Sequence, residues 1–483
     1  MSARLVIVSN RVPSPRERAS QAGGLAVAVR DALRRNGGLW FGWTGEVSEV
    51  STDALKIMSA GKVTYATFDL GKTDHQQFYV GYANSTLWPV LHYRVGLLEY
   101  RREDMEGYLR VNERMARSLL PLLGPEDVIW VHDYHLIPLG QILRRMGVRN
   151  PIGFFLHTPF PVARVFEALP RHEALLEALA SYDLVGFQTD LDLAAFLGCI
   201  GDIAKGNIRS DGSFTAYGHT GAGAVFPASI DGDGFARMAK ESSLSPEGQR
   251  LKESLGGRRL MIGVDRLDYS KGLVNRFLAY DRMLDLRPEH RSKVTFLQVA
   301  ARSRSDVAQY RLLRRELEQA TSRTNGRYAE FDWVPIRYLT RALPRSTIAG
   351  FYRLSQVGLV TPLRDGMNLV AKEYVAAQPS EDPGVLVLSR FAGAAREFDA
   401  AMLVNPYDLD QMAEMMHRAL AMPLEERRDR WVSMMEKLKL HSARSWSRDF
   451  LRELHRRASA RLAAPAPAVA DVPANGAATC GKT

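Results

Sequence analysis

The sequence predicts an α/β protein built from two Rossmann-like, doubly wound domains that face each other across a cleft. Short apolar runs alternate with helical stretches of about ten to fifteen residues, the pattern of a parallel sheet covered on both faces. The alternation breaks once, in a stretch at 211–226 whose Gly, Ser, His and Thr residues predict hairpins, and then restarts. The residues suited to chemistry follow the predicted strands at their carboxyl ends, where such folds bind ligands.

The first half of the chain carries five apolar runs that predict buried strands, at residues 5–9, 39–43, 127–131, 152–156 and 183–187. Helices are expected at 25–35 and 74–87, and Pro89 is expected to end the second of them. The loop at 13–24 is long for a strand-to-helix connection, so it is either functional or a plain surface insertion. We assign this half, residues 1–228, to the first domain.

The second half repeats the rhythm, with strands expected at 260–264, 294–299, 357–360 and 385–388, and helices at 272–285, 306–319 and 370–377. A linker at 227–233 precedes it, and residues 229–440 are assigned to the second domain. The helix at 441–461 is expected to pack back toward the first domain. The Ala- and Pro-rich end at 462–483 has little charge and no periodicity, which is typical of a disordered tail.

One stretch organises the second domain, the residues from Thr361 to Glu373. A strand, a tight turn and a helix start follow each other there, so several backbone N–H groups point at one spot, which suits a phosphate. Gly366 and Asn368 lie in the turn, where a positive φ or a helix cap is needed. Asp365 and Glu373 add carboxylates suited to sugar hydroxyls. An ordinary capped turn explains the same residues equally well.

A second loop carries two cations. Arg266 and Lys271 follow the first predicted strand of the second domain and are five residues apart. On one loop they can converge on a diphosphate, with the start of a helix behind them. The alternative is a pair of solvated charges. Together the two loops suit an activated donor whose leaving group is a diphosphate.

The composition limits the partners. The chain has 483 residues, of which 46% are hydrophobic and 24% charged, and a net charge of +10. The charges are scattered, so phosphate-bearing small molecules are expected rather than a nucleic acid or another polyanion. The two cysteines form no CxxC pair, which disfavours a zinc ribbon or a disulfide framework. Since no apolar run reaches the ~20 residues that span a bilayer, we expect no membrane partner and a cytoplasmic location.

Eight motifs occur in order along the chain: Ser9-Asn-Arg11, Gly23-Gly24, Leu39-Trp-Phe-Gly-Trp43, Leu87-Trp-Pro89, His132-Asp-Tyr-His135, Phe154-Phe-Leu-His-Thr-Pro-Phe-Pro161, Arg266-Leu-Asp-Tyr-Ser-Lys-Gly272 and Arg364-Asp-Gly-Met-Asn-Leu-Val-Ala-Lys-Glu-Tyr374. The ordered set resembles the retaining trehalose-6-phosphate synthases of glycosyltransferase family 20, most of all the bacterial form. The resemblance implies a GT-B fold and a role in trehalose biosynthesis and osmoprotection. The implied reaction transfers glucose from UDP-glucose to glucose 6-phosphate, giving α,α-trehalose 6-phosphate and UDP.

The resemblance also implies an acceptor site. Arg11 and Arg304 would hold the phosphate of the acceptor, and the hydroxyl of Tyr79 would donate to it. Trp88 would line the acceptor pocket, and Asp133 would hold the acceptor hydroxyls. Without the resemblance, Trp88 and Tyr79 are also explained by packing in the core.

The implied donor site consists of Gly23, Gly24, Arg266, Lys271, Leu343, Asp365, Leu369, Val370, Ala371, Lys372 and Glu373. Arg266 and Lys271 would clamp the diphosphate, Asp365 would contact the donor glucose, and Glu373 would hold the ribose hydroxyls. The segment from Leu369 to Glu373 would hold the phosphates and the ribose. The implied catalytic residues are Asp133, His157, Arg266, Lys271 and Asp365, with His157 next to the transferred sugar.

The implied mechanism is a front-face transfer with retention of the anomer. UDP departs, an oxocarbenium-like species forms, and the acceptor hydroxyl attacks from the same side. A double displacement would need a carboxylate nucleophile, and no residue stands out as one. The protein then contributes positioning and stabilisation of the leaving diphosphate. Trp88 and Thr158 are expected to govern anomer selectivity.

No metal and no other cofactor are expected. His132 and His135 flank Asp133, but histidines on a strand-to-helix turn are more often scaffold than ligands. Three Asp-x-Asp pairs are considered as metal sites, at 190/192, 231/233 and 408/410. The first and third pairs are explained as the starts of helices, and the second lies in the expected linker.

Three positions depart from the pattern of the family. Pro227-Ala-Ser-Ile230 replaces the usual hinge sequence, and Thr158 replaces an apolar residue. Leu343 stands where the family has an aromatic residue near the base, so GDP-glucose and ADP-glucose are alternative donors. A related glycosyltransferase that uses another acceptor is a separate alternative. A catalytically silent regulatory relative is a further alternative. A homo-oligomer is expected.

Overall fold

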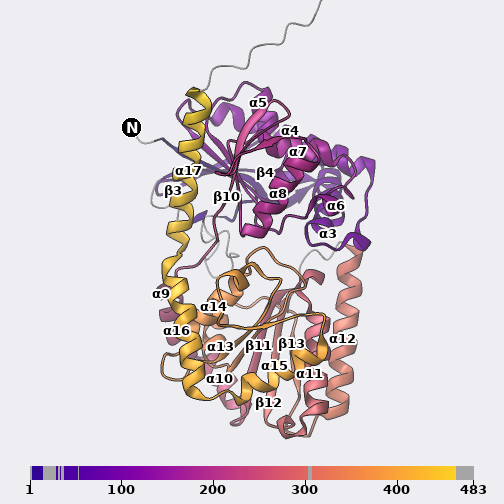
Figure 1. Ribbon diagram of the computed structural model, residues 1–483. Helices are drawn as coiled ribbons and strands as arrows, with labels where there is room; N and C mark the ends of the chain where they lie inside the picture. Colours follow the sequence, from indigo (N-terminus) through magenta and orange to yellow (C-terminus); the bar gives the residue numbers. More distant parts are fainter. Residues whose placement is uncertain are drawn as a thin grey trace, which may run out of the picture.

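The structure is a computed structural model that describes residues 3–14, 29–30, 33, 37–52, 54–302 and 307–463 (Figure 1). Its strands form a 10-stranded sheet and a 6-stranded sheet, which lie in the upper and lower parts of Figure 1. The smaller sheet has the order β13-β12-β11-β14-β15-β16, the doubly wound order of a Rossmann fold. The larger has the order β3-β4-β2-β1-β5-β6-β7-β10-β9-β8.

The larger sheet contains β1 (Leu5–Arg11), β2 (Gly38–Ser48), β3 (Lys56–Ala60), β4 (Val63–Gly71), β5 (Val128–His132), β6 (Ile152–Phe155), β7 (Leu184–Phe187), β8 (Asn207–Ile208), β9 (Ser213–Ala216) and β10 (His219–Val225). Its helices are α2 (Lys72–Asp74), η2 (His75–Leu87), α3 (Trp88–Leu91), η3 (Val95–Leu97), α4 (Arg102–Leu119), η4 (Leu120–Leu122), η5 (Tyr134–Leu136), α5 (Leu139–Arg145), α6 (Ala163–Phe166), α7 (His172–Ala180) and α8 (Asp190–Asp202).

The smaller sheet contains β11 (Arg259–Arg266), β12 (Val294–Ala301), β13 (Ile336–Leu339), β14 (Val357–Val360), β15 (Val385–Ser389) and β16 (Met402–Val404). The helices that follow along the chain are α9 (Gly232–Ser243), α10 (Pro246–Leu255), η6 (Tyr269–Lys271), α11 (Leu273–Leu286), η7 (Pro288–His290), α12 (Ala308–Tyr328), α13 (Arg345–Arg353), α14 (Leu369–Ala377), η8 (Gly393–Arg396), α15 (Leu409–Ala421), α16 (Leu424–Leu440) and α17 (Ala443–Ala463).

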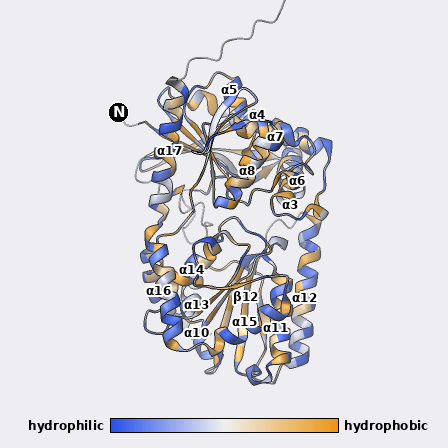
Figure 2. Cartoon of the chain, in the orientation of Figure 1, coloured by the Kyte–Doolittle hydropathy of each residue, from blue (hydrophilic) through white to orange (hydrophobic). Residues whose placement is uncertain are grey.

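Each strand predicted from an apolar run is found. β1 lies inside the larger sheet, where it pairs in parallel with β2 and β5, and the residues from Leu5 to Val8 are buried. A run that is apolar throughout belongs in such a position, because helices cover both faces of the sheet. Figure 2 shows the hydrophobic colour along the strands and mixed colours on the surrounding helices, as expected for amphipathic helices over a buried sheet.

Antiparallel strands flank the parallel ones. β9 and β10 form the hairpin expected in the Gly- and Ser-rich stretch. At the other edge, β3 pairs with β4 in a hairpin that the sequence analysis missed. All five residues of β3 are exposed, so this edge strand lacks the apolar pattern by which the others were found.

The helix predicted at 74–87 differs from the prediction in kind and in length. Residues His75 to Leu87 form a π-helix, η2, and the N–H of Trp88 donates to the carbonyl of Ala83, five residues back. Pro89 does not end the helical segment, because it lies in the first turn of α3, where its missing N–H costs no hydrogen bond. π-Helical segments are rare in proteins, and those that occur are frequently found at functional sites.

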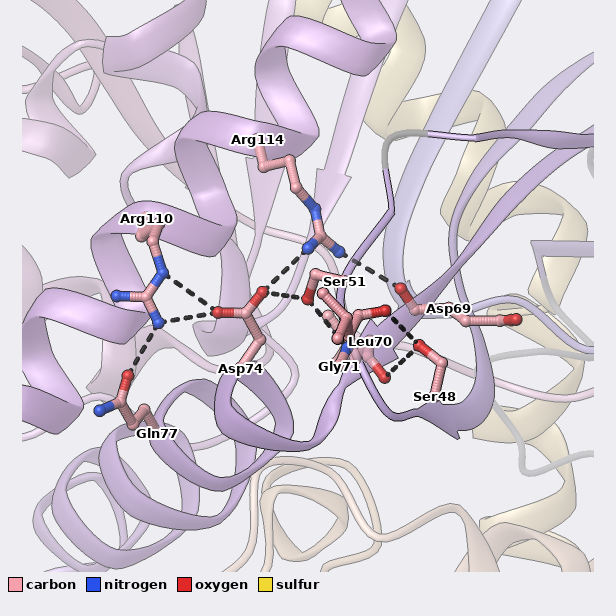
Figure 3. Close-up of polar contacts among 10 residues, drawn as sticks. Ser48, Ser51, Asp69, Leu70, Gly71, Asp74, Gln77, Arg110 and Arg114 are labelled. Carbon is pink, nitrogen blue, oxygen red and sulfur yellow. Dashed lines mark hydrogen bonds and ion pairs between the residues drawn. The ribbon is translucent and has the colours of Figure 1, made fainter.

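A charged network holds the start of η2 (Figure 3). Oδ1 of Asp74 accepts from Nε and Nη2 of Arg110 at 3.1 and 2.7 Å, and its Oδ2 accepts from Nη1 of Arg114 at 2.8 Å. The hydroxyl of Ser51 also donates to Asp74. Both arginines come from α4, so the network fixes the amino end of the π-helix to that helix and to the loop between β2 and β3.

The chain returns from the second sheet to the first between its last two described helices. α16 packs on the second domain through Met434 and Leu438, whereas α17 packs on the first sheet (Figure 1). The ring of Phe450 stacks on Trp130 of β5 with 4.5 Å between the centroids. In the part of the chain that the structure describes, every helix is too short or too polar to span a lipid bilayer.

Candidate active site between the two sheets

The loops after β11 and β14 lie side by side, because these strands are neighbours in the second sheet. Nζ of Lys271, at the end of η6, donates to Oδ2 of Asp365 at 2.5 Å, and both side chains are largely buried. The N–H of Leu363 donates to the carbonyl of Ser270 at 2.8 Å, which joins the two loops directly. The cation predicted for the diphosphate and the carboxylate predicted for the sugar therefore meet at one point.

The loop that carries the cation is held by its backbone and by one carboxylate. Gly272 has a φ of 64°, and a Cβ there would lie 2.4 Å from the carbonyl oxygen of Thr361. A larger residue fits neither this conformation nor this space. Asp268 accepts from the N–H of Ser270 at 3.0 Å and from the hydroxyl of Tyr310 at 3.1 Å.

The start of α14 has the geometry expected for an anion site. Asn368 is the N-cap residue with a φ of 69°, and its Nδ2 donates to Oδ2 of Asp365 at 2.9 Å. The N–H groups at the start of any helix lack acceptors within the helix, so those of Leu369 and Val370 suit a phosphate. Gly366 and Asn368 are both candidates for a positive φ in this turn. Only Asn368 has one. Gly366 is buried where the two domains meet.

A buried arginine that the sequence analysis missed holds both donor loops. The side chain of Arg276 on α11 is 0% exposed, and its Nε donates to Oγ1 of Thr361 at 2.9 Å. Its Nη1 donates to Oδ2 of Asp265 at 2.6 Å and to Oε1 of Gln298 at 2.8 Å. Its Nη2 donates to the carbonyl of Lys271 at 3.4 Å. This guanidinium thus connects the ends of β11 and β14 with Gln298 inside β12.

Glu373, predicted to hold the ribose, is paired with an arginine. Its Oε1 accepts from Nε and Nη2 of Arg345 at 3.0 and 2.7 Å. Burial raises the pKa of Glu373 above its ordinary value, and the Arg345 guanidinium opposes that shift. Leu343, predicted to lie near the base, is partly buried against the core of the second domain just before α13.

The side chain of Lys372 is directed away from the donor loops. Its Nζ donates to the carbonyl of Ala228 in the interdomain linker at 2.8 Å and pairs with Glu397 at 2.7 Å. Burial lowers the pKa of Lys372, and Glu397 partly offsets this effect. The predicted donor contact of this residue is therefore restricted to its backbone. The hydrogen bond from Lys372 to Ala228 also holds the linker segment at 227–230, whose sequence departs from the family pattern.

Trp88 connects the first domain to the donor loops. The guanidinium carbon of Arg266 lies 5.8 Å from the centroid of the Trp88 ring. The indole is buried and packs on Tyr134 at 5.5 Å and on His92 at 4.0 Å between centroids. Nδ1 of His92 hydrogen-bonds the carbonyl of Trp88 at 2.9 Å, and burial lowers the pKa of His92 to about 4. His92, which the sequence analysis did not single out, is therefore neutral at pH 7.

Tyr79, on η2, lies in a group of aromatic rings that come from several elements. Its ring centroid is 5.4 Å from His75, 5.8 Å from His135 and 5.5 Å from Trp43. It also packs against a small hydrophobic cluster to which both domains contribute. The π-helix thus presents Tyr79 where the two domains meet.

The carboxyl ends of β1, β5 and β6 carry the other residues of the predicted acceptor site. Arg11 ends β1 and is exposed. Asp133 follows β5 with a φ of 76°, and its Oδ1 accepts from the N–H of His157 at 3.2 Å. Nε2 of His157 lies 3.1 Å from Nδ1 of His132, and burial lowers the pKa of His157 to about 3. Thr158 is buried, and within the described residues its hydroxyl has no hydrogen-bond partner.

The Asp-x-Asp pairs have structural partners. Asp231 caps α9 and Asp408 caps α15, so the second pair begins a helix and does not lie in the linker. Asp190 pairs with Arg396 at 2.7 Å, and Asp192 accepts from Thr189 at 2.6 Å. Gly23, Gly24 and Arg304 lie outside the described residues, so their roles stay predictions.

One of the missed residues had a signal in the sequence. Leu273, Arg276, Phe277 and Tyr280 have the i, i+3, i+4, i+7 spacing of one helix face, which predicts that Arg276 is buried with its apolar neighbours. A buried arginine needs partners, and the carboxyl ends of the strands supply them. Arg345 had no comparable signal, because it is separated from Glu373 by a helix and a strand.

Comparisons with known proteins agree with this arrangement. Residues 3–456 match the model of Glycosyltransferase family 20. Trehalose-6-phosphate synthase from Sinorhizobium fredii is 51% identical over 455 residues, which cover 94% of this chain and 98% of that protein. Trehalose-6-phosphate synthase from Klebsiella pneumoniae is 47% identical over 452 residues, which cover 94% of this chain and 95% of that protein.

Solved structures share the fold. The crystal structure of an α,α-trehalose-phosphate synthase (UDP-forming) from Burkholderia xenovorans in complex with glucose 6-phosphate matches with a TM-score of 0.92 and 50% identity, covering 94% of this chain and 100% of that chain. The structure of the Escherichia coli protein bound with UDP-2-fluoro glucose matches with a TM-score of 0.90 and 46% identity, covering 94% and 99%. The expected GT-B fold is therefore confirmed.

Proposed function

The chain belongs to glycosyltransferase family 20, and we propose that it acts as an α,α-trehalose-phosphate synthase (UDP-forming). It transfers glucose from UDP-glucose to glucose 6-phosphate and releases α,α-trehalose 6-phosphate and UDP. This reaction belongs to trehalose biosynthesis. The proposal draws its substrates from relatives about half identical to this chain and matched over nearly all of it.

The observation that carries the proposal is the contact between Arg266 and Trp88. A cation of the donor loops and an indole of the first domain lie 5.8 Å apart across the two domains. A sugar transfer needs the donor diphosphate and the acceptor sugar within reach of each other. Residues of both kinds meet here, with Lys271 and Asp365 on the same side as Arg266.

On the donor side, Arg266 and Lys271 are assigned to the diphosphate. The backbone at the start of α14, with Leu369, Val370 and Ala371, supports the phosphates. When the donor binds, Lys271 exchanges its contact with Asp365 for a phosphate oxygen, which leaves Asp365 to accept hydrogen bonds from the sugar hydroxyls. Glu373, oriented by Arg345, is assigned to the ribose hydroxyls.

On the acceptor side, Arg11, Tyr79 and Arg304 are assigned to the phosphate of glucose 6-phosphate. Asp133 is assigned to the acceptor hydroxyls, and Trp88, with Thr158, to the selection of the anomer. His157 is assigned a place next to the transferred sugar. Burial keeps its pKa far below 7, so its ring is neutral and can form a hydrogen bond with the sugar without adding charge.

The transfer is proposed to be a front-face reaction. The bond between the anomeric carbon and the diphosphate oxygen breaks with both electrons going to UDP, and the acceptor hydroxyl oxygen bonds to the same face of that carbon. The hydroxyl proton passes to the leaving phosphate oxygen. Arg266 and Lys271 stabilise the charge that builds up on that oxygen, the largest contribution expected from the protein. No metal is assigned to this step.

The test is an assay of the purified chain with UDP-glucose and glucose 6-phosphate. Equal amounts of UDP and trehalose 6-phosphate are expected, with an α,α linkage in the NMR spectrum of the product. Glucose in place of glucose 6-phosphate is expected to react poorly, and EDTA is expected to leave the rate unchanged. If no nucleotide sugar yields a product, the chain is a silent relative and the proposal is wrong.

A panel of UDP-, GDP- and ADP-glucose tests the base. UDP-glucose is expected to have the highest kcat/KM, and a preference for another nucleotide would contradict that part of the proposal alone. A cytoplasmic location and a homo-oligomeric state complete the proposal, and fractionation and light scattering of the purified protein test them.

A further inference from the structure

Two histidines and a carboxylate meet on the second domain, outside the candidate active site. Nε2 of His290, at the end of η7, lies 2.8 Å from Nδ1 of His417 on α15. A carboxylate oxygen of Glu289 lies near them, and this oxygen and one ring nitrogen of each histidine are within 4.8 Å of one another. His290 is buried, His417 is partly exposed and Glu289 is exposed, so the group opens to solvent on one side.

The group lies at the end of the second sheet that is remote from the donor loops. η7 is followed by β12, and Nη1 of Arg259, at the start of β11, donates to the carbonyl of Leu420 at the end of α15. Arg266 is at the opposite end of β11, which has 8 residues and is therefore about 25 Å long. A ligand held by the histidines would not contact the donor.

The placement of the two rings suits a metal ion, because Nε2 of His290 faces Nδ1 of His417. Two facing imidazole nitrogens need either a shared proton or a cation between them, because two lone pairs repel each other.

We propose that Glu289, His290 and His417 form a structural Zn²⁺ site, with water as the fourth ligand. Zinc at 2.0–2.1 Å from two tetrahedrally placed nitrogens sets them about 3.3 Å apart, so the histidines need to separate by only about half an ångström. Two imidazoles and one carboxylate favour zinc over magnesium, which prefers oxygen ligands. Glu289 is exposed and can rotate its carboxylate into place.

The surroundings set the expected strength of the site. Arg287 and Arg259 are nearby cations that oppose a metal ion. Arg287 is paired with Glu414 at 2.9 Å, so part of its charge is neutralised. With three protein ligands and this charge, the site is weaker than a closed site with four ligands. Zinc would link the turn before β12 to α15 and thereby stabilise the second domain.

The experiment is thermal unfolding of the full chain, first treated with EDTA and dialysed, with ZnCl₂ or MgCl₂ added. At 100 times its dissociation constant, zinc is expected to raise Tm by about 5 °C, whereas magnesium is expected to have no effect. Titration calorimetry is expected to find one zinc ion per chain. The kcat with UDP-glucose and glucose 6-phosphate is expected to stay unchanged, because the site does not touch the active site.

Two variants and one control make the test specific. His417→Gln is expected to abolish the zinc-dependent rise in Tm, and Glu289→Gln, at an exposed position that keeps both histidines, is expected to weaken zinc binding at least tenfold. His455→Gln, which removes an exposed histidine of α17, is expected to keep the full effect. If zinc leaves Tm unchanged, or if His417→Gln and His455→Gln behave alike, the histidines form only a hydrogen bond and the proposal is wrong.

Discussion

Gly366 of the second domain lies directly against the carbonyl oxygen of His157 in the first. A Cβ at position 366 would stand 2.0 Å from that oxygen, closer than any real contact. Within the second domain Gly393 packs against the same turn, because a Cβ on Gly393 would lie 1.8 Å from the carbonyl oxygen of Gly366. The donor turn and the loop after β6 therefore leave no room for a side chain at position 366.

Gly366→Ala is expected to hold the two domains apart. Because a misplacement of about 1 Å in a substrate site can cost 100-fold in rate, we expect kcat/KM to fall by about that factor. Steady-state kinetics with UDP-glucose and glucose 6-phosphate measure it. Gly326→Ala on α12 is the control, since nothing lies within 4 Å of its added Cβ. Normal kinetics of Gly366→Ala would show that the contact is unimportant for turnover.

Lys271→Met is expected to lower kcat by about 100- to 1,000-fold, in line with removal of a main electrostatic stabiliser of the leaving group. The variant also leaves the carboxylate of Asp365 without its cation, so UDP should bind more weakly. Stopped assays for UDP release give kcat, and calorimetry gives the affinity for UDP. Lys252→Met removes an exposed lysine of α10 and is expected to change neither. A kcat within threefold of the original would contradict the role of Lys271.

Arg276→Met is expected to destabilise the second domain by about 3–5 kcal/mol, because it leaves the buried carboxylate of Asp265 without its cation. Arg276→Lys should recover little, since a lysine cannot reproduce the separate bonds of the guanidinium to Thr361 and Gln298. Urea unfolding measures the stability. Arg276→Met combined with Asp265→Asn should regain part of it. Equal stability of the single and double variants would contradict a specific ion pair.

Asp74→Asn is expected to loosen the amino end of η2, since it removes the charge that Arg110 and Arg114 hold (Figure 3). Loss of charge-assisted hydrogen bonds should cost about 2 kcal/mol of stability. Because Tyr79 is on the same helix, KM for glucose 6-phosphate should rise about fivefold, or about 1 kcal/mol, while KM for UDP-glucose stays unchanged. Glu106→Gln, which breaks an exposed pair on α4, is the control. Equal changes in both KM values would argue against this role of η2.

His92 predicts a specific loss of stability in acid. Its pKa is lowered to about 4 in the folded chain, while the unfolded chain takes up the proton near pH 6.5. Stability should therefore fall as the pH decreases from about 6.5 to about 4, by about 1.4 kcal/mol per pH unit for this residue. His92→Asn keeps a donor for the carbonyl of Trp88 and should make the pH dependence shallower by that amount. Urea midpoints between pH 4.5 and 7 measure the slope.

His441→Asn serves as the control for that experiment, because His441 is exposed. Its slope should match that of the unchanged chain. If His92→Asn has the same slope as His441→Asn, the ring of His92 is not held neutral by burial.

Buried parallel strands were predictable, because a continuous apolar run indicates a strand whose two faces are both buried. β14 has the bounds that were predicted for it, Val357–Val360. β3 was missed, because a solvated edge strand carries no such pattern. The π-helix was predicted as an ordinary helix, since the spacing of apolar residues does not distinguish a 13-residue π segment flanked by α-helices.

The candidate site was predictable where its residues lie on loops at the carboxyl ends of the strands. Lys271 and Asp365 are on loops after neighbouring strands, and strand order brings them together. Lys372 was placed in the donor site because of its position in the sequence, but its side chain reaches the linker through the interior of the domain. The direction of one side chain in a packed core depends on neighbours from distant segments, which a local pattern does not contain.

The polypeptide passes between the two domains twice, once through the linker before α9 and again between α16 and α17 (Figure 1). A single connection would leave the second domain free to rotate in any direction about that point. A second connection at a different place restricts such rotations, so the path of the chain itself limits how far the donor loops can move relative to the first sheet.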